Sequence, residues 1–209
     1  MTERLYYYSD ELQGEAQVLA CTPVEDGGYA VELSATLFHP QGGGQQADTG
    51  ALGAIPVLRV AQQGDKVLHF TAEPVSAGPV SQQVDGERRR LHARWHSAGH
   101  LIGWVGENHG WQPVKAHHWP GEGRITFAPG ADPQTLEQGA LQAELQRLIA
   151  ANLPRRQLDV DGVRQVGFGD LPVYGCGGTH VASLSELGAV TITAVKMKKG
   201  QLIVQYEMG

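Results

Sequence analysis

The chain has 209 residues and a net charge of −6 at neutral pH, and 41% of its residues are hydrophobic. This length allows one domain or two small ones, and the composition excludes a largely disordered chain. The acidic balance excludes a broadly basic surface, so a nucleic-acid partner would have to be held by local clusters. Three short basic clusters are candidates, although solvated surface charge is the commoner explanation of each: Arg88–Arg90, Arg155–Arg156 and residues 196–199.

The N-terminus and the cysteines indicate a cellular compartment. The first residues lack the apolar stretch of a signal peptide, and no segment reaches the roughly 20 apolar residues that would span a bilayer. Cys21 and Cys176 are the only cysteines, which is too few for a disulfide framework. We therefore expect a cytoplasmic protein that does not contact a membrane.

Short alternating runs separated by turn residues fill the first 84 residues. Residues 17–24 and 29–35 flank one turn, and residues 57–61 and 66–70 flank another at Gly64-Asp65. Hairpins of this kind, without a helical period, predict a small β-barrel or sandwich. Residues 71–83 contain prolines and a glycine and are predicted to be a link.

The pattern becomes helical after residue 85. Apolar spacing predicts one helix over about residues 86–108. A second helix is expected to begin at Asp132, with Pro133 in its first turn, and to end near Leu153. Strands are expected near residues 124–127 and 156–161, and a hairpin from residues 189–196 and 201–207.

These elements predict an α+β fold with two domains. Residues 1–84 would form a small β-barrel. Residues 85–209 would form an α/β two-layer domain in which helices lie on an antiparallel sheet.

Two pairs of metal-binding side chains stand far apart in the sequence. His96 and His100 are four residues apart on the first predicted helix, so they share one face of it. Cys176 and His180 have the same spacing in a glycine-rich loop, where backbone freedom lets two ligands converge. Three imidazoles and one thiolate suit tetrahedral zinc. The sequence therefore predicts one zinc ion per chain.

Two other interpretations of these residues are weaker. A zinc protease needs a glutamate directly after the first histidine of such a pair, and that position is Ser97. Cys176 could be a nucleophile paired with His180, but this assignment leaves His96 and His100 without a role.

A glycine triplet and two adjacent histidines are further candidates. Gly42–Gly44 resembles a phosphate-binding loop but lacks the lysine and the Ser/Thr of a P-loop, so we expect no ATP site. By itself the triplet is typical of a tight loop between strands. His117 and His118 precede a turn, where either could be a general base or contact a substrate, although exposed histidines are common there.

Taken in order, the motifs resemble those of a known family. Thr36 to Gly50, with Gly-Gly-Gly-Gln at its centre, then His96-x-x-x-His100, then Cys176-Gly-Gly-Thr-His180, is similar to the editing region of alanyl-tRNA synthetase. With no room for an aminoacylation domain, the chain is similar to the free-standing AlaX-type alanyl-tRNA editing proteins of medium length. The resemblance covers nearly the whole chain. It implies that the barrel precedes a domain like the second additional domain of threonyl- and alanyl-tRNA synthetases.

The resemblance implies a function and roles for residues. The protein would be an aminoacyl-tRNA hydrolase that deacylates Ser-tRNA(Ala) in trans, with Gly-tRNA(Ala) as a second candidate substrate. Such editing is needed because a pocket made for alanine rejects an added hydroxyl or a smaller residue poorly. The implied zinc ligands are His96, His100, Cys176 and His180, Thr36 would contact the seryl hydroxyl, and the other pocket residues would be Gly42, Gly43, Gly44, Gln45 and His118, the last also being the catalytic candidate.

Two departures from the family pattern concern the amino-acid pocket. His39-Pro40-Gln41 stands where relatives commonly have Tyr-Pro-Glu, and Gly99 stands where a larger residue is often found. Both changes could alter the volume or polarity of the pocket, so the preference between serine and glycine stays open.

Four protein ligands would complete a tetrahedral zinc site, which favours a positioning role for the ion over that of an open catalytic zinc. Two other functions stay open. One is a non-catalytic tRNA-binding module with a structural zinc, and the other is a zinc hydrolase of small esters that needs no tRNA. The sequence does not predict an oligomeric state.

Overall fold

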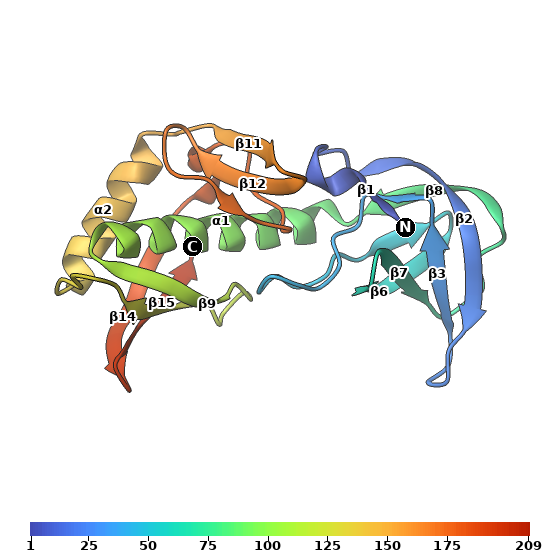
Figure 1. Cartoon of the computed structure of the whole chain (residues 1–209). Helices are drawn as coiled ribbons and strands as arrows, with labels where there is room; N and C mark the ends of the chain where they lie inside the picture. Colours follow the sequence, from blue (N-terminus) through green and yellow to red (C-terminus); the bar gives the residue numbers. More distant parts are fainter. The chain divides into compact units, whose positions relative to one another are not determined.

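The computed structural model describes all 209 residues, Met1–Gly209, in two compact units. The first contains Met1–Gly42 and Gln46–Arg90, and the second contains Gly43–Gln45 and Leu91–Gly209 (Figure 1). Most elements are strands and two are α-helices, which confirms the mixed α+β class. Neither helix combines the length and apolar character needed to cross a membrane.

Six strands of the first unit close a ring of antiparallel pairs. In order around the ring they are β2 (Gln13–Pro23), β3 (Tyr29–Leu33), β7 (Lys66–Thr71), β6 (Ile55–Gln63), β5 (Gly50–Leu52) and β8 (Gly78–Val84). The β2–β3 and β6–β7 pairs are the two hairpins that the turn residues predicted. Apolar side chains fill the ring, among them Val31, Leu33, Phe38 and Val60. Outside it, β1 (Glu3–Arg4) pairs with β4 (Ala35–Thr36), and a short 3-10 helix, η1 (Leu5–Tyr7), follows β1.

The prediction of a link over residues 71–83 is wrong for its second half, which belongs to β8. This strand pairs with both β2 and β5 and so closes the ring. Gln82 and Val84 are buried while their neighbours are exposed, as the pleat of a strand requires. Pro79 lies at the beginning of the strand, where a missing N–H is tolerated. Because proline is typical of links, Pro79 led to the wrong prediction, although the residues after it alternate as in a strand.

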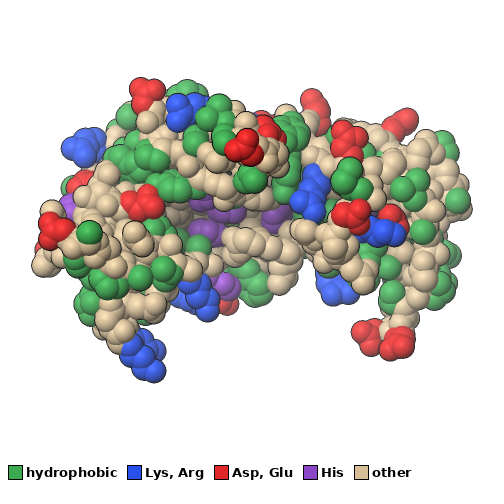
Figure 2. Space-filling model, viewed as in Figure 1, with side chains coloured by type: hydrophobic (Ala, Val, Ile, Leu, Met, Phe, Trp, Pro, Cys, Tyr) green, Lys and Arg blue, Asp and Glu red, His purple; other side chains and the backbone are tan.

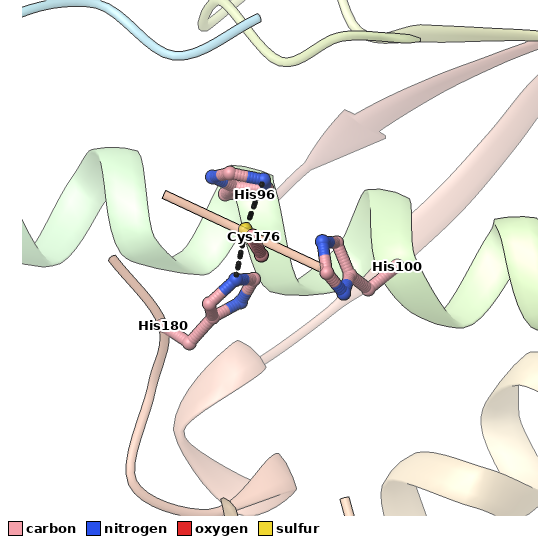
Figure 3. A group of neighbouring side chains, drawn as sticks. All are labelled: His96, His100, Cys176 and His180. Carbon is pink, nitrogen blue, oxygen red and sulfur yellow. Dashed lines mark hydrogen bonds between the residues drawn. The ribbon is translucent and has the colours of Figure 1, made fainter. Parts of the chain in front are cut away.

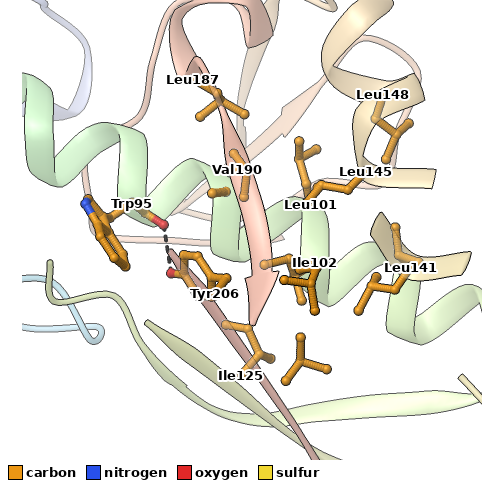
Figure 4. Packing of buried hydrophobic residues seen from close by; sticks show 14 of the residues in the cluster. Trp95, Leu101, Ile102, Ile125, Leu141, Leu145, Leu148, Leu187, Val190 and Tyr206 are labelled. Atoms are coloured by element: carbon orange, nitrogen blue, oxygen red, sulfur yellow. Dashed lines mark hydrogen bonds between the residues drawn. The ribbon is translucent and has the colours of Figure 1, made fainter. Parts of the chain in front are cut away.

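The second unit is built on a four-stranded antiparallel sheet. Its strands run in the order β14 (Val190–Lys198), β15 (Gln201–Met208), β10 (Arg124–Pro129) and β9 (Trp111–His117). The helices α1 (Gly86–Asn108) and α2 (Gln138–Ala150) share one core with this sheet, as Figure 4 shows for Leu101 and Ile102 of α1, Leu141 of α2 and Val190 of β14. Burial of these apolar faces is the main force that holds the layers together.

A smaller sheet leads into the loop that carries two of the predicted ligands. It consists of β11 (Arg155–Val160), β12 (Val163–Phe168) and β13 (Tyr174–Gly175), all antiparallel. Cys176 follows β13 directly, and the 3-10 helix η2 (Leu184–Leu187) follows the loop.

The second helix begins at Gln138 and not at Asp132, so the predicted N-terminus is wrong. Gln134 explains the difference, because both of its backbone groups are bound elsewhere. Its N–H donates to the His109 carbonyl at 2.9 Å, and its carbonyl accepts the Trp111 indole N–H at 2.8 Å. These two bonds hold Gln134 against residues at the junction of α1 and β9, and such tertiary contacts override the Asp-Pro signal.

Candidate metal centre

Four side chains with metal-binding atoms meet in the second unit. His96 and His100 project from one face of α1, and Cys176 and His180 come from the loop after β13 (Figure 3). Their ligand atoms all lie within 4.8 Å of one another. The fold thus brings together the two pairs that the sequence singled out, and the group could hold a metal ion.

The distances around the sulfur fit a shared ion. Cys176 Sγ lies 3.2 Å from His180 Nε2 and 3.5 Å from His96 Nε2. Two ligands that bind one tetrahedral zinc at about 2.0–2.3 Å are about 3.3–3.6 Å apart. The observed separations are therefore close to those that a common ion would impose.

Gln45 determines which nitrogen of His96 faces the sulfur. The Thr179 N–H donates to Gln45 Oε1 at 3.0 Å, and Gln45 Nε2 donates to Thr179 Oγ1 at 2.8 Å, so the orientation of the amide is fixed. Since Oε1 also lies 2.7 Å from His96 Nδ1, this nitrogen carries the proton and donates. His96 Nε2 is left unprotonated and turned toward Cys176. A carbonyl behind the imidazole is the usual support of a metal-binding histidine.

The other two histidines also have the features of ligands. Ser97 Oγ accepts the Val181 N–H at 3.1 Å and lies 3.0 Å from His180 Nδ1, so that His180 Nε2 faces the sulfur. His100 Nδ1 is buried and has no hydrogen-bond partner. Native proteins rarely leave a buried polar atom unpaired, and a metal ion in this cluster would give the His100 ring a partner.

Burial favours the neutral imidazoles that bind metals. It lowers the pKa of His100 to about 4, with a smaller effect from the charge of Arg164. It also lowers the pKa of His180 well below its usual range, and the charges of His100 and Arg164 add to this. Burial raises the pKa of the Cys176 thiol, against the Gly178 N–H and the charge of Arg164, which lower it. Metal binding would therefore displace a proton from the sulfur.

Arg164 shapes the ligand loop and was missed in the sequence. Its Nη1 donates to the carbonyls of Cys176 at 2.8 Å and Gly178 at 2.9 Å, and its Nε donates to Gln157 Oε1 at 2.8 Å. The Cys176 N–H in turn donates to the Arg164 carbonyl. The side chain is buried, so these bonds are shielded from water. Arg164 lies outside every element that the sequence predicted, and no motif in the sequence indicates this role.

A pocket of about 310 Å³ adjoins the cluster. His96, His100 and Cys176 form part of its wall, and Figure 2 shows histidine side chains at the floor of a hollow. The volume is at the lower end of the range of small-molecule sites. It suits a ligand portion as small as one aminoacyl group.

His118 lies in the wall of this pocket and is buried. Its ring stacks on His96, with the centroids 4.4 Å apart, and its Nδ1 lies 2.9 Å from the Tyr206 hydroxyl. Burial lowers the pKa of His118 to about 3, with smaller effects from the charges of His100 and His117. By contrast, His117 lies 3.1 Å from the exposed carboxylate of Glu122 and does not line the pocket.

The glycine segment divides between the two units. Gly43 lines the pocket, and the Gly44 carbonyl accepts the His118 N–H at 2.9 Å. Gly44 has a φ of +78°, and a side chain on it would overlap the carbonyl of Ala116 on β9. This position therefore requires glycine. Gly42 is exposed and does not line the pocket.

Thr36 lies in the first unit and is fully buried. Its hydroxyl accepts the Phe38 N–H at 3.0 Å and lies 2.7 Å from His69 Nε2. His69 Nδ1 lies 3.1 Å from the Val31 carbonyl, which can only accept, so Nδ1 donates and Nε2 accepts the Thr36 proton. The threonine hydroxyl thus donates one hydrogen bond and accepts one within the unit. Its contact with a substrate stays a prediction.

Most arginines of the basic clusters bind other parts of the chain. Arg88 donates to the Ala47 carbonyl, and Arg89 forms a buried ion pair with Asp48. Arg155 and Arg156 also donate to carbonyl groups of the chain. The lysines of residues 196–199 are exposed on the β14–β15 hairpin.

Comparisons with known proteins agree with this geometry. The model of the family described as the threonyl and alanyl tRNA synthetase second additional domain matches residues 163–203. This match includes Arg164 and the ligand pair of the loop.

Two kinds of relatives cover most of this chain. The alanyl-tRNA editing protein Aarsd1 of Bos taurus is 31% identical over 92% of this chain and 46% of its own length, and that of Rattus norvegicus is 34% identical over 87% and 52%. The alanine–tRNA ligase of Halorubrum lacusprofundi is 33% identical over 91% of this chain and 24% of its own length. The chain therefore spans about half the length of the editing proteins that it matches.

Proposed function

Because the chain belongs to the family of alanyl-tRNA editing proteins, we propose that it hydrolyses misacylated tRNA(Ala), with Ser-tRNA(Ala) as the substrate and Gly-tRNA(Ala) as a second candidate. The observation that carries the proposal is the cluster of three imidazoles and one thiol, of which His96, His100 and Cys176 lie in the wall of a pocket the size of an aminoacyl group. The partner would be the acceptor end of tRNA(Ala). We propose no role for ATP and no membrane contact.

The donor set favours zinc over harder metals, because thiolate and imidazole together suit a borderline-soft ion. His96, His100, Cys176 and His180 would hold one ion per chain. When bound, it would help to place the aminoacyl end in the pocket, as the complete set of four protein ligands favours. Gln45 and Ser97 support this by fixing the rings of His96 and His180.

The reaction itself is the hydrolysis of an ester. Water adds to the carbonyl carbon, the bond to the ribose oxygen breaks, and this oxygen takes up a proton, which releases serine and tRNA. The pocket contributes position and selectivity. Its buried polar groups can pair with a seryl hydroxyl, and they are left unpaired when alanine enters, which disfavours alanine. His118 is the proposed contact with the substrate. Gly43 lines the pocket, Gly44 binds the backbone of His118, and Gln45 orients the ring of His96.

A panel of charged tRNAs tests this function. The zinc-loaded protein should deacylate Ser-tRNA(Ala) quickly and Ala-tRNA(Ala) slowly, and zinc should be measured on the same sample. Cys176→Ala should lose both zinc and activity. Cys21→Ala is the matched control, because it removes the other cysteine, which lies in the first unit. Metal-loaded protein that hydrolyses none of the tRNAs would refute the proposal.

A second candidate function is a tRNA-binding module with a structural zinc. The complete set of four protein ligands favours it, because structural sites are closed in this way. This candidate requires tRNA binding without turnover, and loss of the fold of the second unit in Cys176→Ala. A third possibility, a zinc hydrolase of small esters, is disfavoured because Ser97 stands at the position of the protease glutamate. Such an enzyme would hydrolyse free seryl esters as fast as it hydrolyses Ser-tRNA(Ala).

A further inference from the structure

The hydroxyl of Tyr206 has two partners, and these determine its hydrogen. It lies 2.9 Å from the carbonyl of Trp95 and 2.9 Å from His118 Nδ1 (Figure 4 shows the first of these bonds). A carbonyl only accepts, so the single hydroxyl proton is donated to Trp95. The oxygen of Tyr206 must then accept from His118, whose Nδ1 carries a proton. With this proton on Nδ1, the Nε2 of the neutral His118 ring is an acceptor.

The position of His118 is fixed on several sides. Its ring stacks on His96 at an interplanar angle of 22°, and its backbone N–H is bound to Gly44. On α1, Gly99 leaves the space that the ring occupies, because a methyl group at that position would overlap the His118 ring. The departure noted in the sequence at Gly99 therefore has a structural consequence. It admits the imidazole into the pocket wall beside the metal ligands.

The pocket wall indicates which kind of donor group His118 Nε2 would accept a hydrogen bond from. His118 Nε2 makes no hydrogen bond with the protein. Glu107 is the only carboxylate in the pocket wall, and it accepts a hydrogen bond from Tyr174. An ammonium group is better matched by this carboxylate than by an imidazole, because a buried charge needs an opposite charge. The neutral acceptor is suited to an uncharged donor.

We propose that Tyr206 is a positioning residue, which holds His118 so that its Nε2 accepts a hydrogen bond from the hydroxyl of a seryl group. Glycine and alanine lack this donor and would leave Nε2 unpaired. His118 is then the residue that determines specificity, and Tyr206 acts through it. This inference rests on the proposed function for its substrate, but the tautomer of His118 does not depend on it.

Tyr206→Phe tests the proposal in two ways. Nitrogen NMR of the histidine side chains, on zinc-loaded protein without tRNA, should show His118 protonated at Nδ1 in the wild type and partly at Nε2 in the variant. With charged tRNAs, the ratio of kcat/KM for Ser-tRNA(Ala) to that for Gly-tRNA(Ala) should fall about tenfold, the effect of one lost hydrogen bond. Tyr6→Phe, the same change at a buried tyrosine of the first unit, should alter neither quantity.

A second pair of variants keeps the test decisive if Tyr206→Phe is poorly folded. His118→Gln offers an amide oxygen near the position of Nε2 and should retain part of the serine preference, whereas His118→Phe should lose it. The proposal is wrong if His118 is protonated at Nε2 in the wild type, or if seryl and glycyl rates fall by the same factor in Tyr206→Phe. An inactive wild type with the expected tautomer would refute the proposed function and the seryl contact, but not the positioning of His118.

Discussion

Two buried histidines, His69 in the first unit and His118 in the second, each pair with a hydroxyl group but differ at the other ring nitrogen. His69 donates from Nδ1 to the Val31 carbonyl and accepts at Nε2 from Thr36. Both of its nitrogens are used inside the protein. His118 donates from Nδ1 to Tyr206 and has no protein partner at Nε2, although it lines a pocket.

The difference separates a structural imidazole from one that is available to a ligand. A side chain whose donors and acceptors are all satisfied contributes to folding, and a ligand could bind it only by breaking a bond already made. An imidazole that has one nitrogen hydrogen-bonded to the protein and the other facing a pocket is already oriented to bind a ligand. The same distinction applies to the ligand cluster, where Gln45 and Ser97 hold the outer nitrogens and leave the inner ones for an ion.

The largest loss of zinc binding and activity is expected from removing one of the histidine ligands. His100→Ala should abolish zinc binding and lower deacylation of Ser-tRNA(Ala) by more than about 100-fold, beyond the usual effect of changing a group behind a ligand. Zinc content and single-turnover rates measure this. His109→Ala is the control, because His109 is half-buried and pairs with Glu144 outside the cluster. Full zinc content in His100→Ala would contradict the ligand assignment.

The next largest effect is a loss of stability at low pH caused by His69, the histidine whose two ring nitrogens are both hydrogen-bonded within the protein. Burial lowers the pKa of His69 from 6.5 to about 4, so the folded state keeps the ring neutral where the unfolded chain takes up a proton. The stability that this contributes is complete above pH 6.5 and is lost as the pH falls to about 4. The difference corresponds to ~3 kcal/mol. Chemical unfolding of His69→Gln and the wild type at several pH values should show that only the wild type loses this amount. An equal acid sensitivity in both would contradict it.

A somewhat smaller loss is expected from the partner of His69. Thr36→Val keeps the shape but leaves His69 Nε2 and the Phe38 N–H without a partner, which should lower the free energy of unfolding by ~1–3 kcal/mol. Thr36→Ser retains the hydroxyl and should lose less. The same two variants sharpen the comparison with His118. A change in serine preference without loss of stability would show that Thr36 contacts the substrate, as the family resemblance implies.

The smallest effect, on zinc affinity, is expected from changing Arg164, which supports the ligand loop. Arg164→Gln removes the bonds to the carbonyls of Cys176 and Gly178, and should weaken zinc binding about tenfold without abolishing it. Competition with a zinc chelator measures the affinity. Arg124→Gln, at a partly exposed arginine on β10 far from the ligand loop in sequence, is the control. An unchanged affinity in Arg164→Gln would show that the loop is shaped without this residue.

The four ligands and most helices and strands could be predicted from the sequence, because these features depend on the spacing of nearby residues. Four-residue spacing on α1 places His96 and His100 on one face whatever else the chain does. Pro79 and Asp132, by contrast, gave misleading local signals, since the closure of the strand ring and the bonds to Gln134 involve distant residues. Short-range patterns do not contain such contacts.

The same reason explains why the supporting residues of the site were missed. Neither Arg164 nor Tyr206 belongs to a motif in the sequence. Their roles arise only when β12 and β15 are folded against the loop and α1. Gln45 was expected to approach the pocket, but its bonds to His96 and Thr179 depend on residues far along the chain.

X-ray absorption at the zinc edge tests most directly the claim on which the function depends, that one zinc ion is bound by His96, His100, Cys176 and His180. The purified protein should contain one zinc per chain, with three nitrogen neighbours at about 2.0–2.1 Å and one sulfur at about 2.3 Å. Cys176→Ala should contain no zinc, whereas Cys21→Ala should retain both the zinc and its sulfur neighbour. Bound zinc without a sulfur neighbour in the wild type would contradict the account.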